Sequence, residues 1–328
     1  MTCRAQGPSL SSGLAWRIAS GGSDPMGEET GRPGISASGR LFCFGLGYSA
    51  LALARRLRAA GWRVAGTTRA QDKADRLAAE GIEVHLFDRG RPLDDPEKAL
   101  AGTSHLLSSV PPDQAGDPVL DHHRPDVAAM ETLAWLGYLS TTGVYGDRGG
   151  DWVDEDSDRA PTGARGRRRV AAEDAWLDLW ERDGLPVHLF RLAGIYGPGR
   201  SALDGVRDGT ARRIDKPGQL FSRIHVDDIA SVLEASIARP RPGAAYNLCD
   251  DEPAAPQEVV AYACELLGRE PPPLVPFAQA ELSDMARSFY RDNKRVSNAR
   301  IKEELGVRLG YPSYREGLRA ILAAMDRS

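Results

Sequence analysis

From residue 40 onward, hydrophobic positions follow two patterns that alternate along the chain. Short apolar runs are typical of buried strands, and apolar residues at helical spacing are typical of amphipathic helices. The runs that predict strands are 40–44, 62–67, 82–87, 105–110, 135–140 and 186–192. The stretches that predict helices are 50–60, 71–80 and 163–182. Repeated strand–helix units predict an α/β fold, in which helices cover both faces of a parallel sheet through right-handed crossovers.

The pattern changes after residue 196, where glycine, proline and charged residues become frequent. Further helices are predicted at 225–238, 256–267, 298–305 and 313–324, and a strand at 244–248. The main domain is predicted to span 40–195 and to include about 223–250, and a small mixed α/β lobe is predicted from 196–222 and 251–328. Ligands of doubly wound sheets bind at the carboxyl ends of the strands, so we expect a cleft between that edge and the lobe.

The first 38 residues are rich in serine and glycine and show no hydrophobic period. We expect residues 1–38 to be a disordered extension. A start codon placed too early, with Met26 as the rival start, is the alternative. This stretch has two arginines and no acidic residue before Asp24, so it also weakly resembles a transit peptide.

The composition excludes several classes of function. The chain has 42 Lys+Arg against 46 Asp+Glu and a net charge of −4, so it lacks the basic surplus that non-specific nucleic-acid binding needs. No apolar run approaches the ~20 residues of a membrane span. The four cysteines lie far apart without a C-x-x-C pair, so we expect no metal cluster, no disulfide framework and a cytoplasmic setting.

A glycine-rich turn joins the first predicted strand to the first predicted helix and fits G-x-G-x-x-A. Its first glycine permits a tight turn and its second lets the backbone approach a diphosphate. The free N–H groups of the helix start attract the anion. We therefore predict a Rossmann-type, doubly wound domain that binds a dinucleotide, unless the glycines serve only the turn. The predicted contacts are Gly45, Leu46, Gly47, Tyr48 and Ser49.

The end of the second predicted strand bears on which dinucleotide binds. An acid there would hold the ribose 2′-hydroxyl of NAD, but this chain has Arg69. A guanidinium can pair with a 2′-phosphate, and Lys73 could assist, so we favour NADP and keep NAD as possible. Arg69 could instead be a solvated surface residue. Asp88 is predicted to reach the adenine amine or, equally, to cap the next turn.

Several further segments occur in a fixed order along the chain. They are 140–146, 191–199, 223–230 and 245–248. Together with the glycine turn, they resemble the extended short-chain dehydrogenase/reductases, the NAD-dependent epimerase/dehydratase family. Three segments resemble an atypical subgroup of that family and extend the likeness almost to the C-terminus. They are 109–112, 221–230 and 293–298.

The resemblance implies roles for particular positions. The family's active-site hydroxyl corresponds to Thr141, and its ribose-contacting strand end corresponds to Val110 and Pro111. The loop after the sixth strand, where the family contacts the nicotinamide, supplies Ala193, Gly194 and Ile195. His225 and Asp228 match a motif that closes the cleft, but capping a helix start is their simpler role.

The chain departs from the family in its long helix. The family has Tyr-x-x-x-Lys four residues before a glutamate that corresponds to Glu173, and these positions here hold Arg165 and Arg169. Arginine does not exchange protons at physiological pH. Arg169 could keep the ribose-binding part of the lysine's role, and Arg165 could bind an anionic group or polarise a carbonyl. Positions 165, 169, 172 and 176 share one helical stripe that we expect to point inward.

Other residues that can move a proton have simpler interpretations. Tyr145 fits a packed turn, and Asp147 and His225 are weak candidates. His122 and His123 are adjacent and therefore cannot share a helix face, so we interpret both as surface residues. The tryptophans at 152, 176 and 180 are most simply core or interface residues.

These features leave three functional hypotheses. The first is an NADP-dependent oxidoreductase, epimerase or dehydratase that acts on a small polar substrate with a non-standard proton donor. The second is a sensor that kept dinucleotide binding and lost the chemistry, and the third, disfavoured by the glycine turn, binds no nucleotide. The resemblance also implies a possible homodimer.

Overall fold

The computed structural model describes residues 38–327. The extension predicted for residues 1–38 lies outside the described residues, apart from residue 38. Within the described part of the chain, no helix combines the length and the apolar character that a membrane crossing requires.

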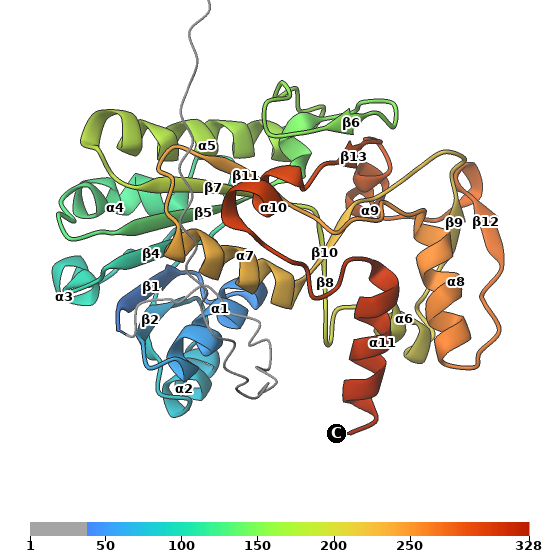
Figure 1. Ribbon diagram of the computed structural model, residues 1–328, viewed down its shortest axis with the longest axis horizontal. Coiled ribbons are helices and arrows are strands. Elements are labelled where there is room, and N and C mark those ends of the chain that lie inside the picture. The colour runs from blue at the N-terminus through green and yellow to red at the C-terminus, as the bar shows by residue number, and fades with distance from the viewer. Residues whose placement is uncertain (1–37, 328) are drawn as a thin grey trace, which may run out of the picture. The chain divides into compact units, whose positions relative to one another are not determined.

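A seven-stranded sheet forms the centre of the main domain (Figure 1). Every neighbouring pair in it is parallel, and the strand order is β11-β7-β5-β4-β1-β2-β3. The strands are β1 (Arg40–Phe44), β2 (Arg63–Thr68), β3 (Glu83–Leu86), β4 (His105–Ser108), β5 (Trp135–Thr141), β7 (Val187–Leu192) and β11 (Ala245–Leu248). The prediction of a Rossmann-type parallel sheet is therefore confirmed, and each predicted strand lies within about two residues of its place.

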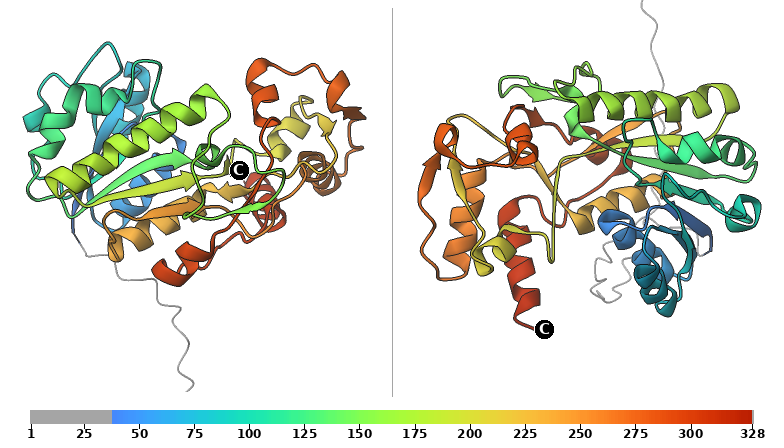
Figure 2. Two further views of the ribbon diagram at one scale, coloured as in Figure 1. Left: turned by 90° about the horizontal axis from the view of Figure 1, so that it is seen from above. Right: turned by 180° about the vertical axis from the view of Figure 1, so that it is seen from behind.

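Helices cover both faces of this sheet (Figure 2). On one face lie α1 (Tyr48–Ala59) and α7 (Val226–Ala238), and on the other lie α4 (Pro118–Ala128) and α5 (Ala164–Asp183). Alternation along β1 divides its side chains between the two cores. Leu41 and Cys43 pack with α1 and α7, whereas Phe42 and Phe44 pack with α4 and α5. The helix α2 (Gln71–Ala79) follows β2.

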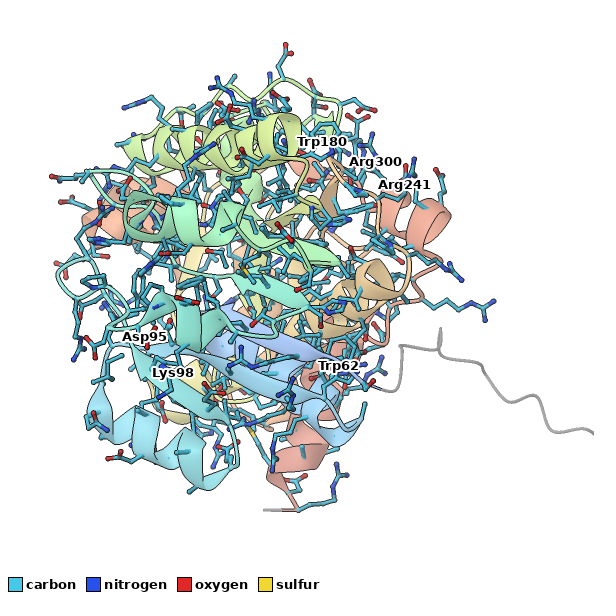
Figure 3. The ribbon with its side chains drawn as sticks, turned by 90° about the vertical axis from the view of Figure 1, so that its left-hand side faces the viewer. Trp62, Asp95, Lys98, Trp180, Arg241 and Arg300 are labelled. Carbon is cyan, nitrogen blue, oxygen red and sulfur yellow. The ribbon has the colours of Figure 1, made fainter. Side chains whose placement is uncertain are left out.

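Two helices between β3 and β5 were not predicted. The first, α3 (Pro96–Leu100), is capped by Asp95, whose carboxylate accepts from the Lys98 N–H at 3.0 Å (Figure 3). The second, α4, contains Pro125 and departs from helical geometry at His123. Proline and a weak apolar stripe hide such a helix from a periodicity argument.

The interpretation of His123 as a surface residue is wrong. Its side chain is 2% exposed and stacks on the Phe44 ring, with centroids 5.8 Å apart. Its Nε2 accepts from the Leu93 N–H at 3.1 Å. The irregular turn at this residue rotates the imidazole into the core, which adjacency in sequence does not reveal.

Residues beyond 196 build a lobe with its own hydrophobic core. Its helices are α6 (Ala202–Arg207), α8 (Pro256–Leu266), α9 (Asp284–Phe289) and α11 (Tyr314–Met325). Short parallel pairs accompany them: β8 (Gly194–Tyr196) with β10 (Arg223–His225), β9 (Arg213–Asp215) with β12 (Leu274–Pro276), and β6 (Trp152–Val153) with β13 (Arg295–Val296).

The helix α10 (Ala299–Leu305) does not belong to that lobe core. Its Ile301 and Leu305 are buried in the core formed by α1, α7 and the sheet. The predicted assignment of all of 251–328 to the lobe is therefore too broad, because the chain returns to the main domain before α11.

Candidate functional site

The glycine turn lies between β1 and α1 and accepts no larger residue at Gly45. Gly45 has a φ of 85°, and a Cβ there would lie 2.9 Å from the Ser109 Oγ and 3.2 Å from the Val110 Cγ2. Ser109 also donates a hydrogen bond to the Gly45 carbonyl. The end of β4 therefore packs directly under the turn.

Hydrogen bonds to β2 hold the turn open toward the helix start. The Gly45 N–H donates to the Thr67 Oγ1 at 2.8 Å, and the Leu46 N–H donates to the Thr67 carbonyl at 2.7 Å. The helix α1 begins at Tyr48 without a side-chain cap. Among the described residues, the N–H groups of Tyr48 and Ser49 meet no acceptor, so this turn fits a diphosphate.

Charged residues gather beyond β2, where the adenosine part of a dinucleotide is expected. Arg69 is exposed, and its carbonyl accepts from the Arg91 Nη2 at 2.9 Å. The Arg91 Nε is buried and finds no partner among the described residues. Asp88 accepts from the Gly90 N–H at 2.9 Å and faces Arg91 at 3.4 Å, which is the geometry of a turn cap.

Lys73 has a different position from the predicted one. Its ammonium donates to the Leu46 carbonyl at 2.7 Å, so it supports the glycine turn. Burial lowers the pKa of Lys73, and neighbouring arginines lower it further. Sequence reasoning missed Arg91, which reaches Arg69 only because the chain turns back after β3.

A pocket of about 370 Å³ opens at the carboxyl ends of β5 and β7. Four predicted residues line it: Thr141, Ala193, Gly194 and Ile195. The Thr141 Oγ1 accepts from the Gly143 N–H at 3.2 Å. The other lining residues are Thr142, Gly143, Leu192, Tyr196, Leu220, Phe221, Ser222, Arg223, Ser288, Phe289, Asp292, Lys294 and Val296. Val110 packs at the glycine turn and, like Pro111, does not line this pocket.

Tyr48 connects the glycine turn to the segment beside the pocket. Its hydroxyl donates to the Pro198 carbonyl at 3.0 Å, and the Arg200 guanidinium lies 5.8 Å from the centre of its ring. A Cβ at Gly197 would lie 2.4 Å from that hydroxyl. The glycine turn therefore contacts the loop that follows β8, and β8 itself lines the pocket.

Neither Arg165 nor Arg169, both on α5, lines the pocket. The Arg169 Nη1 donates to the Leu139 carbonyl at 2.6 Å and to the Tyr138 hydroxyl at 3.1 Å. Arg165 is exposed, and its guanidinium lies 5.7 Å from the ring centre of Phe289, a pocket residue. The predicted inward stripe holds at 172 and 176 but not at Arg165, which is exposed.

An ionic network lies buried beneath the pocket. Glu173 is fully buried, pairs with the Arg191 Nη2 at 2.9 Å and accepts from the Ser140 Oγ at 2.5 Å. The Arg191 Nη1 donates to the Tyr145 hydroxyl at 2.9 Å, and that hydroxyl donates to the Asn247 Oδ1 at 2.7 Å. Burial raises the pKa of Tyr145 to about 12. The interpretation of Tyr145 as a packed turn residue is confirmed.

The other weak candidates also have structural partners. His225 caps α7 by accepting from the Asp227 N–H at 3.2 Å. Asp228 accepts from the N–H groups of Gly310 and Tyr311 and thereby fixes the loop before α11. Asp147 accepts from the Asn293 N–H at 2.7 Å. Capping and loop anchoring account for these polar groups.

Sequence reasoning missed the ionisable pocket residues Lys294, Asp292 and Arg223. They come from the second half of the chain and meet Thr141 only in the folded protein. The available signals were the resemblances of segments 223–230 and 293–298, which carried no role for Arg223 or Lys294. Burial lowers the pKa of Lys294 from its usual value, although Asp292 and Asp147 partly oppose this effect.

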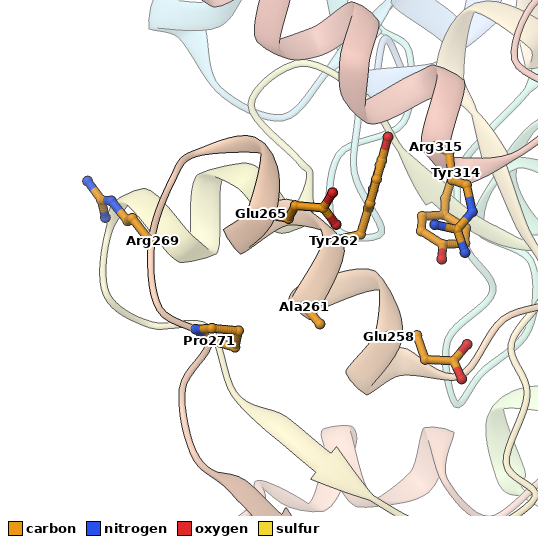
Figure 4. Close-up of a pocket in the computed structure, with 8 residues that line it drawn as sticks. All are labelled: Glu258, Ala261, Tyr262, Glu265, Arg269, Pro271, Tyr314 and Arg315. Atoms are coloured by element: carbon orange, nitrogen blue, oxygen red, sulfur yellow. The ribbon is translucent and has the colours of Figure 1, made fainter.

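A second hollow, of about 450 Å³, lies in the lobe between α8 and α11 (Figure 4). Arg315 lies over the rings of Tyr314 and Tyr262, at 4.7 and 5.1 Å from their centres, and Glu258 and Glu265 come from α8. No residue predicted for the site lines this hollow. The candidate site is therefore the sheet-edge pocket together with the glycine turn.

Comparisons with known proteins agree with this arrangement, although no family model matches the chain. Over 278 residues, the chain is 30% identical to protein YeeZ of Escherichia coli K12, a match that covers 82% of this chain and 94% of that protein. A conserved protein of unknown function from Silicibacter pomeroyi is 54% identical, with a TM-score of 0.81, covering 87% and 99% of the two chains.

A third protein carries a family description. It is a putative NAD-dependent epimerase/dehydratase from Methylobacillus flagellatus, 26% identical, with a TM-score of 0.63 over 88% of this chain and 99% of that one. The parallel sheet order, the glycine turn and these likenesses agree with one another. The chain therefore belongs to one family with protein YeeZ, and its structural neighbours are members of the NAD-dependent epimerase/dehydratase family, which have the extended short-chain dehydrogenase/reductase fold.

Proposed function

We propose that this protein is an NAD(P)-dependent enzyme of the oxidoreductase or epimerase/dehydratase type that acts on a small polar substrate. One observation carries the proposal: an uncapped glycine-turn helix and a side-chain-lined pocket share one sheet edge and touch through the Tyr48–Pro198 hydrogen bond. A bound nicotinamide dinucleotide would supply hydride exchange at its nicotinamide ring. The protein's own residues bind and orient the dinucleotide and the substrate, and they exclude water from the site.

Each part of the site has a proposed task. The free N–H groups of Tyr48 and Ser49 hold the diphosphate, and Val110 and Pro111 flank the ribose. The segment 193–195 forms the nicotinamide side of the pocket, and the Thr141 hydroxyl meets a substrate oxygen there. Because Arg169 donates to the Leu139 carbonyl, we propose that it positions the end of β5, and with it Thr141.

We propose NADP as the dinucleotide. Arg69 supports this choice, and Arg91 adds a second guanidinium at the same place, with one N–H group that lacks a partner among the described residues. Two guanidinium groups suit a 2′-phosphate, and the exposed end of β2 presents no acid for a 2′-hydroxyl. NAD is the alternative.

Titration with NADPH and NADH tests this proposal. We expect Arg69→Ala to weaken NADPH binding by roughly 10–100-fold, because a hydrogen bond to a charged group contributes ~1.5–3 kcal/mol. NADH affinity should not change, and Lys98→Gln, on exposed α3, is the matched control. Equal loss of both dinucleotides would remove Arg69 from the 2′-phosphate site, and no binding of either would refute the proposed function.

A sensor that binds NADP(H) without turnover is the second candidate. The observation that favours it is the pair of arginines at the family's Tyr and Lys positions, since neither exchanges protons. Turnover of any small carbonyl compound with NADPH would decide against it. The implied homodimer stays a prediction, which light scattering would check.

A further inference from the structure

Lys294 lines the pocket together with Thr141 and comes from the segment that leads into β13. Its side chain is 11% exposed, and its ammonium donates to the Gly146 carbonyl at 2.9 Å. The nearest carboxylate oxygen, on Asp292, is 3.7 Å away. A lysine ammonium has three donors, so at least one remains for a ligand even when both of these groups are counted as partners.

The preceding residue, Asn293, fixes this segment in place. Its side-chain amide donates to the Gly218 carbonyl and accepts from the Leu220 N–H, at 2.9 and 3.1 Å. Its main-chain carbonyl accepts from the N–H groups of Arg148 and Gly150. The Lys294 side chain therefore starts from a rigid backbone, as a preorganised functional group requires.

The surroundings of Lys294 favour proton exchange. Burial is the largest influence on it and lowers its pKa, because the ammonium loses water. The carboxylates of Asp292 and Asp147 act in the opposite direction, and the Arg148 guanidinium adds to the lowering. A lysine held in this way can release and regain a proton nearer to neutral pH than an exposed one.

The other ionisable pocket residues are less suited to this task. The Tyr196 hydroxyl is turned toward the Ser313 carbonyl at 3.3 Å, and burial raises its pKa. Arg223 donates to the carbonyls of Phe221 and Ala254, and a guanidinium does not release protons at physiological pH. Asp292 accepts from the Thr162 hydroxyl at 2.5 Å.

We propose that Lys294 binds the reacting oxygen of the substrate and exchanges a proton with it, in place of the tyrosine that the family carries in the helix corresponding to α5. This inference rests on the proposed function. The substrate class is a small aldehyde or ketone, or the matching alcohol. Apolar contacts come from Phe221 and Phe289, and 370 Å³ is at the small end of the ~300–1,000 Å³ range of ligand pockets.

The proton balance of this step is simple. In reduction, the carbonyl carbon accepts the electron pair of a hydride from the reduced dinucleotide, and the oxygen takes a proton from the Lys294 ammonium. The products are the alcohol, the oxidised dinucleotide and the neutral amine, which regains its proton from water. Oxidation of the alcohol reverses each transfer.

The decisive measurement needs no known substrate. Uniform ¹³C and ¹⁵N labelling makes the side-chain Cε–Nζ group of each lysine visible by NMR, and Lys294→Gln identifies the Lys294 signal. We expect this signal to titrate below the usual pH range of a lysine. Glycolate, a small hydroxy acid, should raise its pKa, because a bound anionic oxygen favours the ammonium. Lys73, which lies under the glycine turn, is the internal control and should not respond.

The titration is recorded with and without NADP⁺. A Lys294 signal with an ordinary pKa, or one that glycolate leaves unchanged in both states, would overturn the proposal. Failure of the protein to bind NADPH would instead refute the proposed function, and the response of Lys294 to glycolate alone would still be measured. The two failures are therefore distinguishable.

Kinetics separate proton exchange from a purely structural role. Lys294→Arg retains a cation and a donor for the Gly146 carbonyl but cannot release a proton. With a panel of short aldehydes and ketones, we expect a ~10²–10⁴-fold loss of kcat, an unchanged Kd for NADPH and loss of the alkaline fall in kcat. Full turnover with the wild-type pH profile would refute the proposal.

Discussion

The glycine turn and the sheet-edge pocket lie at the same edge of one sheet but are built in opposite ways. The turn comes from consecutive residues, and its binding groups are main-chain N–H donors. The pocket draws on segments from Thr141 to Val296, and its polar groups are side chains. A local motif tolerates change elsewhere in the chain, whereas a composite pocket depends on every element that positions it.

The interactions that stabilise the turn and the pocket differ as well. Hydrogen bonds from Gly45 and Leu46 to Thr67 hold the turn. Beneath the pocket, Glu173 and Arg191 form a buried ion pair, which the partly exposed Arg159 joins at 3.3 Å from Glu173. Breaking such a pair leaves a buried carboxylate poorly compensated, so the pocket should be the more fragile region.

The largest expected effect therefore comes from Arg191→Ala. Removing the guanidinium leaves the buried Glu173 with only the partly exposed Arg159, at 3.3 Å, as a cationic partner, and we expect a loss of ~3–5 kcal/mol in the free energy of unfolding, measured by urea denaturation. The double variant Glu173→Met/Arg191→Met should recover much of that loss, because it removes both charges. A loss below ~1 kcal/mol in Arg191→Ala would show that the pocket does not depend on this pair.

A smaller effect is expected at the turn, from Gly45→Ala. Its φ of 85° disfavours a side chain, and the new Cβ would crowd the Ser109 Oγ at 2.9 Å. We expect ~1–3 kcal/mol of destabilisation and loss of NADPH binding. Gly149→Ala is the matched control, since Gly149 has a φ of 59° and nothing within 4 Å of its Cβ position. Retained NADPH affinity in Gly45→Ala would contradict the role of the turn.

The smallest effect concerns the link between the two regions. Tyr48→Phe removes the hydrogen bond to the Pro198 carbonyl, and we expect ~0.5–1.5 kcal/mol less stability by the same denaturation assay. Tyr314→Phe is the control, because that buried hydroxyl has no partner among residues 38–327. If both variants lose the same free energy of unfolding, the Tyr48 hydrogen bond does not stabilise the contact between the glycine turn and the pocket.

Much of the main domain was predictable because the sequence patterns that indicate its strands and helices each span only a few neighbouring residues. Strand alternation and helix spacing placed most strands and the long helices, and the order of motifs led to Thr141 and 193–195. The miss at α4 has a local cause. Pro125 and the irregular turn at His123 hid α4, and only the packing of that helix buries the imidazole.

The sequence by itself determined the parallel sheet, the glycine turn and the arginines at positions 165 and 169, because each depends on residues within a few positions of one another. Only the tertiary structure decided that Arg165 and Arg169 lie outside the pocket and that Arg91 joins Arg69. It also brought Lys294 to Thr141. These contacts arise when distant segments pack together, and the desolvation that lowers the pKa of Lys294 exists only after that packing.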